Sequence, residues 1–429
     1  RVTTKLGYGV GQLSEGVKQA AFNTFLFFYY NQVLGLPGSL VGMAALLALV
    51  VDAITDPMVG QMSVRLRSRW GRRHPFMLAG AIPFGFAIIA LFSPPVGLSE
   101  SGLFAWLLGW AIAVRLMLTL FFVPHLSLGA ELVTDYYERT SLIGYRVFFT
   151  YAGILVTTVT GFALFFPATD EFPNGLLNAA SYSSFGIFCA VLAVVAMLTT
   201  VIATWSSIPY LSQSSSDGTE SSPLLAFISV FKTLKQKAFR VLFSATLLFN
   251  TLAGVVQTLE VYMATFVFGF EPHHLAGLAG SVLDCIVFAS PVAQAMARKL
   301  EKKRALAFCV VIGSLFAGAP MLLYLAGLLT PMPIVTKFSL VFILNGVSQI
   351  FFIAYIILLD SMLSDTIDEY ELNTGKREEG LFFASRAFAT KASYGLGSFF
   401  AGVGLDVIKF PRNATPENVP PEAVAGLAT

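Results

Sequence analysis

The sequence predicts an all-α polytopic membrane protein, and two observations lead to this fold class. Of the 429 residues, 56% are hydrophobic and 12% are charged, whereas soluble globular domains carry about 25% charged residues. Apolar runs of about 20 residues, long enough to span a bilayer as a helix, recur along the chain. The net charge of +2 gives no electrostatic basis for nucleic-acid binding, so the expected partners are a small-molecule substrate and membrane lipid.

About eleven membrane helices are predicted from these runs and from the turn signals between them, such as GLPGS and FSPPVG. They are expected at residues 6–34, 39–61, 75–94, 103–133, 142–168, 182–207, 238–269, 274–297, 305–330, 337–363 and 380–408. The first run is too long for a cleaved signal peptide, so we expect it to remain as a span.

The connections between the helices predict the orientation of the chain. Clusters of Lys and Arg follow the second, fourth, sixth, eighth and tenth helices, for example RLRSRWGRRH and ARKLEKKR, whereas the alternate connections are poor in both. Basic residues stay on the cytoplasmic side of membrane proteins. The sequence therefore predicts a cytoplasmic N-terminus.

The chain divides into two similar halves around a polar, serine-rich linker. We expect an N-terminal six-helix bundle at 1–207, a cytoplasmic linker at 208–237 and a C-terminal bundle at 238–429. DPMVGQMSVRLRSRWGRR in the first half matches SPVAQAMARKLEKKR in the second, and TDYYERT matches IDEYELN. Repeated six-helix halves are the pattern of major facilitator transporters. A twelfth helix is then expected, and PPEAVAGLAT resembles the start of one that is truncated here.

Two carboxylates interrupt the second helix. Asp52 and Asp56 are four residues apart and therefore share one helix face, with Thr55 adding a hydroxyl beside them. A charge at the bilayer centre costs about 2.5–3.5 kcal/mol, so such residues usually face a cavity. Paired carboxylates repel unless they share a proton or hold a cation such as Na⁺. The sequence predicts a cation site here; the alternative is a pair of aspartates bound to basic residues of a neighbouring helix.

Other charged residues inside the helices are candidates for coupling and substrate binding. Lys391 lies in the middle of the eleventh helix and is expected to pair with Asp52 or Asp56 and to compete with a bound cation. Arg115 is expected either to contact an anionic group of the substrate or to pair with an acid. On the first helix Glu15, Gln19 and Asn23 share a face and Lys18 is adjacent, and the seventh helix adds Glu260. Glu15 and Lys18 have the alternative of simply pairing with each other.

Charged residues also gather at the predicted cytoplasmic helix ends. They are either solvated topology signals or ion pairs of a gate that closes the inner face. The gate hypothesis covers Arg65, Arg72, Glu131, Asp135, Glu138, Arg139, Asp365, Asp368 and Arg377. No Walker motif, HExxH motif or nucleophile elbow is present, so we expect a protein that is not an enzyme and needs no cofactor.

Several of these motifs together resemble the glycoside–pentoside–hexuronide:cation symporter family. They are KLGYGVGQ, DAITDPMVGQ, RSRWGRRHPF, GAELVTDYYERTSLIGYR and DTIDEYE…GKREEG, and the similarity extends over residues 5–405. The resemblance implies a twelve-helix major facilitator fold, alternating access and sugar uptake driven by Na⁺, Li⁺ or H⁺.

The resemblance also implies roles for single residues. The aspartates that bind the cation in the family match Asp52 and Asp56, and the polar position between them is Thr55. A threonine of the family's fourth helix matches Thr119, and the lysine of its eleventh helix matches Lys391. The sugar-binding positions differ, because two family aspartates fall on Gly16 and Phe122, and an arginine position falls on Val147 beside Arg146. We therefore add Phe122 and Arg146 to the substrate candidates.

The sequence thus predicts a cation-coupled symporter for a sugar or glycoside-type solute. Na⁺ or H⁺ is the expected coupling ion, and the expected state is a monomer in a cell membrane, the inner membrane of a bacterium. Two alternatives stay open. One is a cation-coupled carrier of an amphiphile such as a lysolipid, which the 40 phenylalanines leave possible. The other is a nontransporting sensor on a transporter fold.

Overall fold

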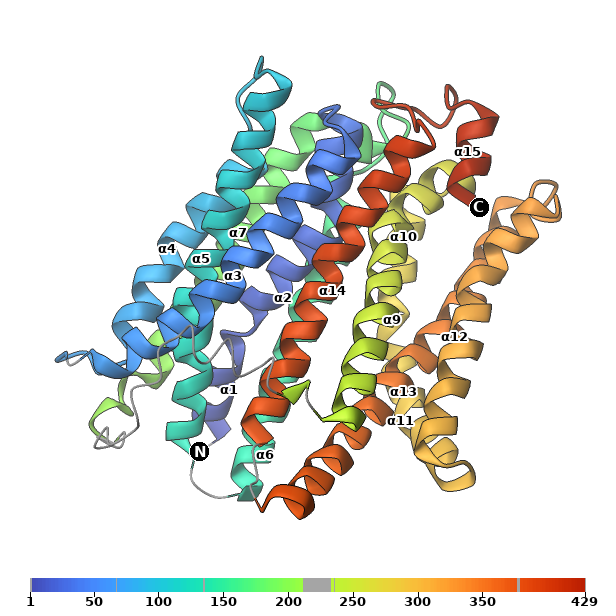
Figure 1. Ribbon diagram of the computed structural model, residues 1–429. Helices are drawn as coiled ribbons and strands as arrows, with labels where there is room; N and C mark the ends of the chain where they lie inside the picture. Colours follow the sequence, from blue (N-terminus) through green and yellow to red (C-terminus); the bar gives the residue numbers. More distant parts are fainter. Residues whose placement is uncertain are drawn as a thin grey trace.

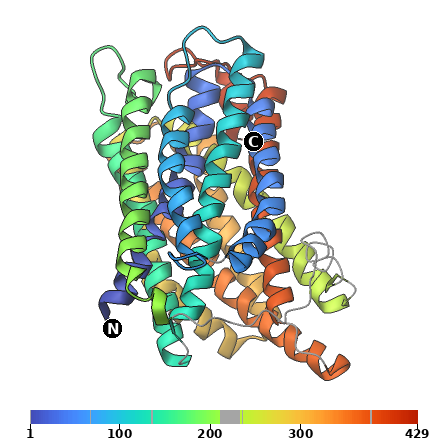
Figure 2. The same ribbon diagram turned by 90° about the vertical axis from the view of Figure 1, so that its left-hand side faces the viewer.

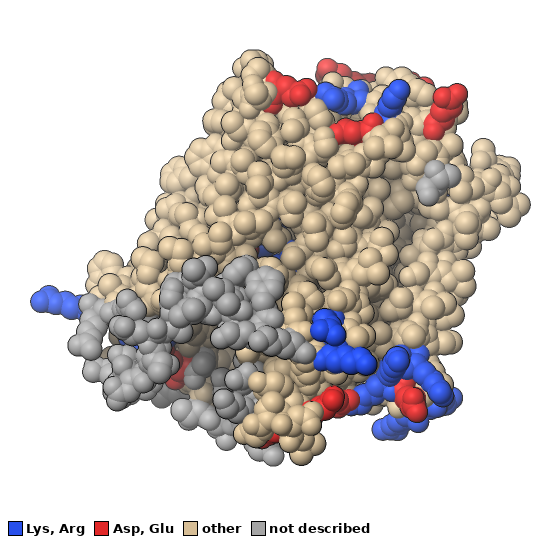
Figure 3. Space-filling model, viewed as in Figure 1, with Lys and Arg blue, Asp and Glu red and all other residues tan. Residues whose placement is uncertain are grey.

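The computed structural model is an all-helical bundle and describes residues 2–66, 68–133, 136–210, 233–234, 236–375 and 379–428. In the described part, eight helices are long and apolar enough to cross a membrane, or nine if one bent pair counts as a single span. The helices run side by side along a common direction (Figure 1). On the face seen in Figure 3, acidic and basic residues gather at the two ends, and the broad band between them shows little charge. This distribution fits a protein surrounded by lipid.

The helices of the first half follow the predicted ranges closely. They are α1 (Val2–Val10), α2 (Leu13–Ala20), the π-helical segments η1 (Ala21–Leu26) and η2 (Tyr29–Val33), α3 (Gly38–Arg65), α4 (His74–Leu91), α5 (Glu100–Leu132), α6 (Tyr136–Thr160) with η3 (Gly161–Phe165), the 3₁₀ turn η4 (Gly175–Leu177) and α7 (Ala179–Trp205). The range predicted for the first helix is thus largely helical, but the helix is interrupted between α1 and α2.

The second half has the predicted order as well. Its elements are η5 (Ile208–Tyr210), α9 (Lys237–Tyr262) with η6 (Met263–Val267), α10 (Pro272–Gly280), α11 (Val282–Lys299), α12 (Lys302–Leu325), α13 (Ile334–Thr374), α14 (Glu379–Val407) and α15 (Pro421–Ala428). α13 continues beyond the predicted end at 363, and its last turns project past the neighbouring helices in Figure 2. It ends where Gly375 takes a left-handed conformation, with φ of 69°. The charged stretch IDEYELN, expected as a connection, is therefore helical.

The interruption of the first helix has a local cause. The backbone N–H of Gln12 donates to the Gly9 carbonyl, one residue closer than in a regular α-helix. The carbonyl of Tyr8, which this leaves free, accepts a hydrogen bond from Nε2 of the buried His125 at 2.9 Å. Gly11 permits the close packing at this point, because a Cβ there would lie 2.6 Å from the Thr200 hydroxyl. Side chains of α5 and α7 therefore stabilise a break that the apolar pattern does not reveal.

The two halves contact each other through a small number of helix pairs. Within the first half α4 packs against α5 and α7, and α2 packs against α6; within the second half α13 packs against α11 and α12, and α9 packs against α14. Between the halves, the main contacts are α3 with α14 and α6 with α10. The domain boundaries at 207 and 238 stay a prediction, because residues 211–232 lie outside the described part.

One end of the bundle is closed by contacts between the halves. This sealed end, where α3 begins and α14 ends, is opposite the end that holds the N-terminus (Figure 1). Gly38 and Gly402 meet there backbone to backbone. The Asp406 carboxylate accepts from the backbone N–H groups of Gly38 and Ser39 at 3.0 and 2.8 Å. Further across the seal, the Tyr262 hydroxyl donates to Oδ1 of Asn31 at 2.7 Å.

Candidate cation and substrate sites

The two aspartates of the predicted cation site lie on successive turns of α3. This helix packs between α5 of its own half and α14 of the other half, so its polar face is covered from both sides. The Asp52 side chain is 9% exposed and the Asp56 side chain is 26% exposed. Pro57 follows directly and cannot donate to the carbonyl of Ala53, which leaves one more oxygen of α3 without its helical partner.

Thr119 of α5 connects the two carboxylates. Its Oγ1 lies 3.1 Å from Oδ1 of Asp52 and 2.8 Å from Oδ1 of Asp56. A hydroxyl carries one proton and can donate to one of these oxygens at a time. The second contact is favourable when one carboxylate is protonated or when a cation lies between the three oxygens. This arrangement is therefore suited to exchange a proton or a monovalent cation.

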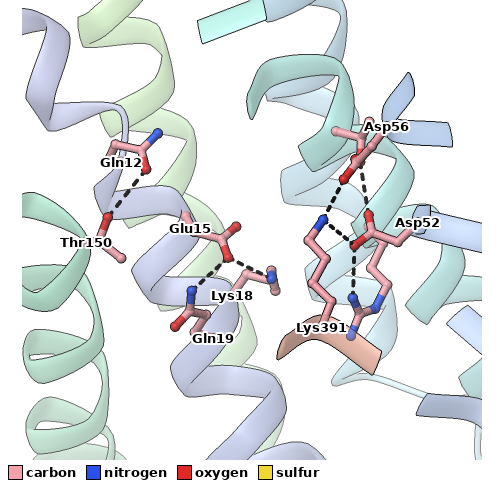
Figure 4. Close-up of polar contacts among 10 residues, drawn as sticks. Gln12, Glu15, Lys18, Gln19, Asp52, Asp56, Thr150 and Lys391 are labelled. Atoms are coloured by element: carbon pink, nitrogen blue, oxygen red, sulfur yellow. Dashed lines mark hydrogen bonds and ion pairs between the residues drawn. The ribbon is translucent and has the colours of Figure 1, made fainter. Parts of the chain in front are cut away.

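Two basic side chains balance the carboxylates (Figure 4). Nζ of Lys391, from α14, lies 2.5 Å from Oδ2 of Asp56 and 3.3 Å from Oδ2 of Asp52. Arg115, from α5, places Nη1 at 3.3 Å from Oδ2 of Asp52, and its guanidinium lies over the Phe22 ring at 5.5 Å. The cluster has two negative and two positive charges and joins helices of both halves.

The two basic residues differ in their accessibility. The Lys391 side chain is 40% exposed, whereas the Arg115 side chain is 13% exposed. Arg115 is thus largely buried in the protein interior, and Lys391 is the more accessible of the two basic residues. Thr55 donates to the carbonyl of Asp52 at 3.3 Å and does not contact either carboxylate.

The polar residues of the first helix form a separate group. Glu15 accepts hydrogen bonds from Lys18 and from Gln19, both at 2.9 Å. Asn23 is half-buried one turn further along. In Figure 4 Glu15, Lys18 and Gln19 lie on α2 beside the carboxylate cluster. The pairing of Glu15 with Lys18, which the sequence left as an alternative, is present in this structure.

A cavity with about 970 Å³ of empty space, its opening included, lies between the halves. Its walls come from η1, α6 and η3 of the first half and from α9, η6, α10, α11 and α13 of the second. The polar residues that line it are Thr24, Tyr151, Thr158, Gln257, Glu260, Asn345 and Gln349. Of the predicted substrate residues, Glu260 lines this cavity.

The remaining substrate candidates lie elsewhere. Phe122 packs against the apolar core of the first half. Arg146 is half-buried on α6, where its side chain interacts with Tyr8. Gln257, Asn345 and Gln349 were not among the predicted site residues. Their spacing gives a signal: 257 and 260 are three apart on α9, and 345 and 349 are four apart on α13, so each pair shares a helix face.

The ion pairs described for predicted gate residues each join two residues of the same half. Glu131 pairs with Arg72 at 3.3 Å and Glu138 with Lys5 at 2.6 Å in the first half, and Asp365 pairs with Lys302 at 2.6 Å in the second. Asp368 is exposed near the end of α13. Asp135 and Arg377, and the side chains of Arg65 and Arg139, lie outside the described residues. A gate between the halves stays a prediction.

The most buried of the ion pairs described at these helix ends includes Arg73, which the gate hypothesis omitted. Arg73, whose side chain is 7% exposed, donates to Glu131 at 2.9 Å and to the Ser63 hydroxyl at 2.7 Å. It connects the start of α4 to the ends of α3 and α5. Its burial and multiple partners are those of a structural ion pair.

Comparison with known proteins agrees with this geometry. The model of the MFS/sugar transport protein family matches residues 7–429. The inner membrane symporter YicJ of Escherichia coli is 27% identical, over 94% of this chain and 82% of its own length. The mouse sphingosine-1-phosphate transporter MFSD2B is 26% identical, over 91% and 78%. The crystal structure of a mutant of the nucleoside transporter NupG superposes with a TM-score of 0.64 at 13% identity, over 100% of this chain and 97% of that one.

The NupG superposition confirms the major facilitator fold, and the family match confirms what the motifs indicated. The chain belongs to the MFS/sugar transport protein family, in agreement with its resemblance to the glycoside–pentoside–hexuronide:cation symporters, and is a multi-pass membrane transporter.

Proposed function

We propose that this transporter is a symporter that couples the entry of Na⁺ or H⁺ to the uptake of a sugar or glycoside-type solute. The observation that carries the proposal is the position of the carboxylate cluster, which lies where α3 of one half contacts α14 of the other. Asp52, Asp56 and Thr119 supply oxygen atoms suited to a hard monovalent cation or a shared proton.

Charge balance explains how a cation acts on this site. The described cluster is neutral when Asp52 and Asp56 face Arg115 and Lys391, so a bound cation makes the ammonium of Lys391 surplus. Repulsion then favours release of Lys391, the more exposed of the two basic residues. Cation binding therefore replaces a link between the halves with a link inside the first half.

The release of Lys391 connects ion binding to movement of the halves. In this structure the sealed end is closed, and the Lys391–Asp56 contact holds α14 against α3 nearer the middle. Loss of that contact frees α14 to move relative to α3 when substrate binds between the halves. Alternating access, with the central site exposed to one side of the membrane at a time, follows from such a movement.

The orientation in the membrane follows from the basic connections. The basic connections between α3 and α4 and between α11 and α12 lie at the end that holds the N-terminus in Figure 1, and we propose that this end faces the cytoplasm. An inner membrane location is supported by the similarity to YicJ. The sealed end then faces the outside, and the structure represents a state that is closed to the outside.

Reconstituted uptake tests the proposal. Purified protein in proteoliposomes is given a panel of sugars, glycosides and lysolipids while Na⁺ and pH gradients are imposed separately. We expect one of the two gradients to drive accumulation and Asp56→Cys to abolish it. Asp170→Cys, an exposed aspartate in a connection at the sealed end, is the matched control. Undiminished gradient-driven uptake by Asp56→Cys contradicts the proposed cation site.

An amphiphile is the second candidate substrate, and the similarity to MFSD2B favours it. The same panel separates the two candidates, because accumulation of a lysolipid without any sugar assigns the carrier to amphiphiles. A nontransporting sensor is expected to accumulate neither class of solute under either gradient.

A further inference from the structure

Four polar side chains on one wall of the cavity share an unusual feature. Gln257 and Glu260 lie on α9, and Asn345 and Gln349 lie on α13. Within the described part of the chain, none of the four makes a hydrogen bond or an ion pair. Polar groups inside a membrane protein are costly unless they are satisfied by water or a ligand. This set is therefore available to bind a solute.

Helix geometry brings the four groups to the same wall. Residues three or four apart lie one above the other on a helix, so each helix presents two polar groups in a column. α9 and α13 contact each other and both line the cavity, so the two columns belong to one site. Together they offer one carboxylate, which accepts hydrogen bonds, and three amides, which both donate and accept.

The described lining of the cavity carries a negative charge and no positive charge. Among the described residues that line the cavity, Glu260 is the charged one, and none is Lys, Arg or His. The basic residues near the centre of the bundle are engaged elsewhere: Lys18 with Glu15, and Arg115 and Lys391 with the α3 aspartates. A negative group placed here meets an uncompensated carboxylate.

From this arrangement we infer that Glu260 is a specificity-determining residue that selects hydroxylated solutes without a negative charge. The inference rests on the proposed function and deepens it by naming the substrate class. The carboxylate accepts hydrogen bonds from two neighbouring hydroxyls of a neutral glycoside, while Gln257, Asn345 and Gln349 bind the remaining hydroxyls and ring oxygen. Tyr151 and Phe162 on the facing wall supply apolar surface for the carbon face of a pyranose ring.

The same arrangement predicts which solutes bind poorly. A uronide differs from its neutral glycoside by a carboxylate, and a lysophospholipid or a sugar phosphate carries a phosphate. Each brings a second negative charge close to Glu260, and juxtaposed like charges cost binding affinity. An amino sugar replaces one hydroxyl by an ammonium group, whose positive charge Glu260 tolerates.

The test uses matched sets of ligands that share a sugar ring and differ in one substituent and its charge. Purified wild-type protein in nanodiscs is titrated by calorimetry with the methyl glycoside, its uronide and its amino sugar, in the gluco, galacto and manno series. In a series that binds, we expect a dissociation constant for the uronide at least about tenfold higher than that for the neutral glycoside, because like charges oppose binding. In Glu260→Gln we expect that ratio to fall below about three.

Controls separate loss of charge from loss of folding. Glu260→Gln keeps the shape and hydrogen-bonding length of the side chain, and its thermal midpoint is compared with that of the wild type. Glu422→Gln, an exposed glutamate at the start of α15, is the control that keeps the wild-type ratio.

Three outcomes overturn the inference. They are a uronide that binds the wild type as tightly as its neutral glycoside, an unchanged ratio in Glu260→Gln, and the absence of binding in all three series. The titrations use a fixed Na⁺ concentration and pH and impose no gradient. A failure of ion coupling in the uptake experiment therefore does not affect the binding result. A failed binding test likewise does not affect the result on ion coupling.

Discussion

Replacing Lys391 by Met isolates the competition between the ammonium group and the coupling ion. The variant keeps a long, unbranched side chain on α14 but removes the charge that lies 2.5 Å from Asp56 and 3.3 Å from Asp52. The two carboxylates then retain Arg115 as their basic neighbour, so the described cluster carries one net negative charge. We expect the variant to bind a monovalent cation more tightly than the wild type does.

The size of the effect follows from the geometry. Removing one partner of a buried ion pair typically costs about 3–5 kcal/mol. Lys391 is 40% exposed, so solvent screens part of the interaction, and we reduce the figure to about 2 kcal/mol. A cation that fills the vacated position recovers this free energy, which corresponds to about a 30-fold lower dissociation constant.

Cation binding to purified protein measures this quantity directly. Na⁺ is titrated by calorimetry into wild-type and Lys391→Met protein in nanodiscs, and the pH dependence of the thermal midpoint reports proton binding in Na⁺-free buffer. Lys337→Met, a half-buried lysine of α13 outside the cluster, is the control. A Lys391→Met protein that folds but binds both ions as the wild type does, or more weakly, refutes the competition between lysine and cation.

Three further predictions concern stability and conformation. Glu131→Gln leaves the buried guanidinium of Arg73 with a weaker partner and should lower the unfolding free energy by about 2–3 kcal/mol. The Glu138 side chain is 54% exposed, so Glu138→Gln should lower it by less than about 1 kcal/mol. Thermal unfolding in detergent distinguishes the two variants. His125→Phe removes the hydrogen bonds to Tyr8 and Gln12 and should destabilise the fold by about 2–4 kcal/mol in the same assay; an unchanged midpoint would show that these bonds do not hold the break in the first helix. Gly402→Leu places a side chain against the backbone of α3 and should force the sealed end apart. A cysteine that replaces Asn31 should then react faster with a membrane-impermeant maleimide. An unchanged reaction rate would count against a closed contact between the halves at this end.

The order and extent of the helices could be predicted from the sequence because the bilayer sets the length of an apolar span. The extension of α13 to Thr374 could not, because charged residues such as those of IDEYELN are compatible with a helix in water as well as with a loop. The break in the first helix also escaped prediction. It depends on His125 and Thr200, which approach from other helices and leave no trace in the local pattern.

The candidate sites show the same distinction. The cation cluster could be predicted because Asp52 and Asp56 are neighbours on one helix and their charge demands a partner inside a membrane. The cavity could not be located in the same way, because Glu260 and Asn345 come together only when α9 and α13 pack. Phe122 illustrates the limit, since matching a position to a family motif does not fix whether the side chain faces a cavity or the core.

The carboxylate of Asp406 makes the beginning of α3 depend on the other half of the protein. α3 starts after Pro37 without a side-chain cap of its own, and its first free N–H groups are satisfied by an acid at the end of α14. When the halves separate at that end, the helix that holds the cation site loses its cap, at a cost of about 1 kcal/mol. Outward opening and fraying of the first turn of α3 are therefore expected to occur together. Hydrogen exchange of the Ser39 backbone amide would report how often the carrier opens.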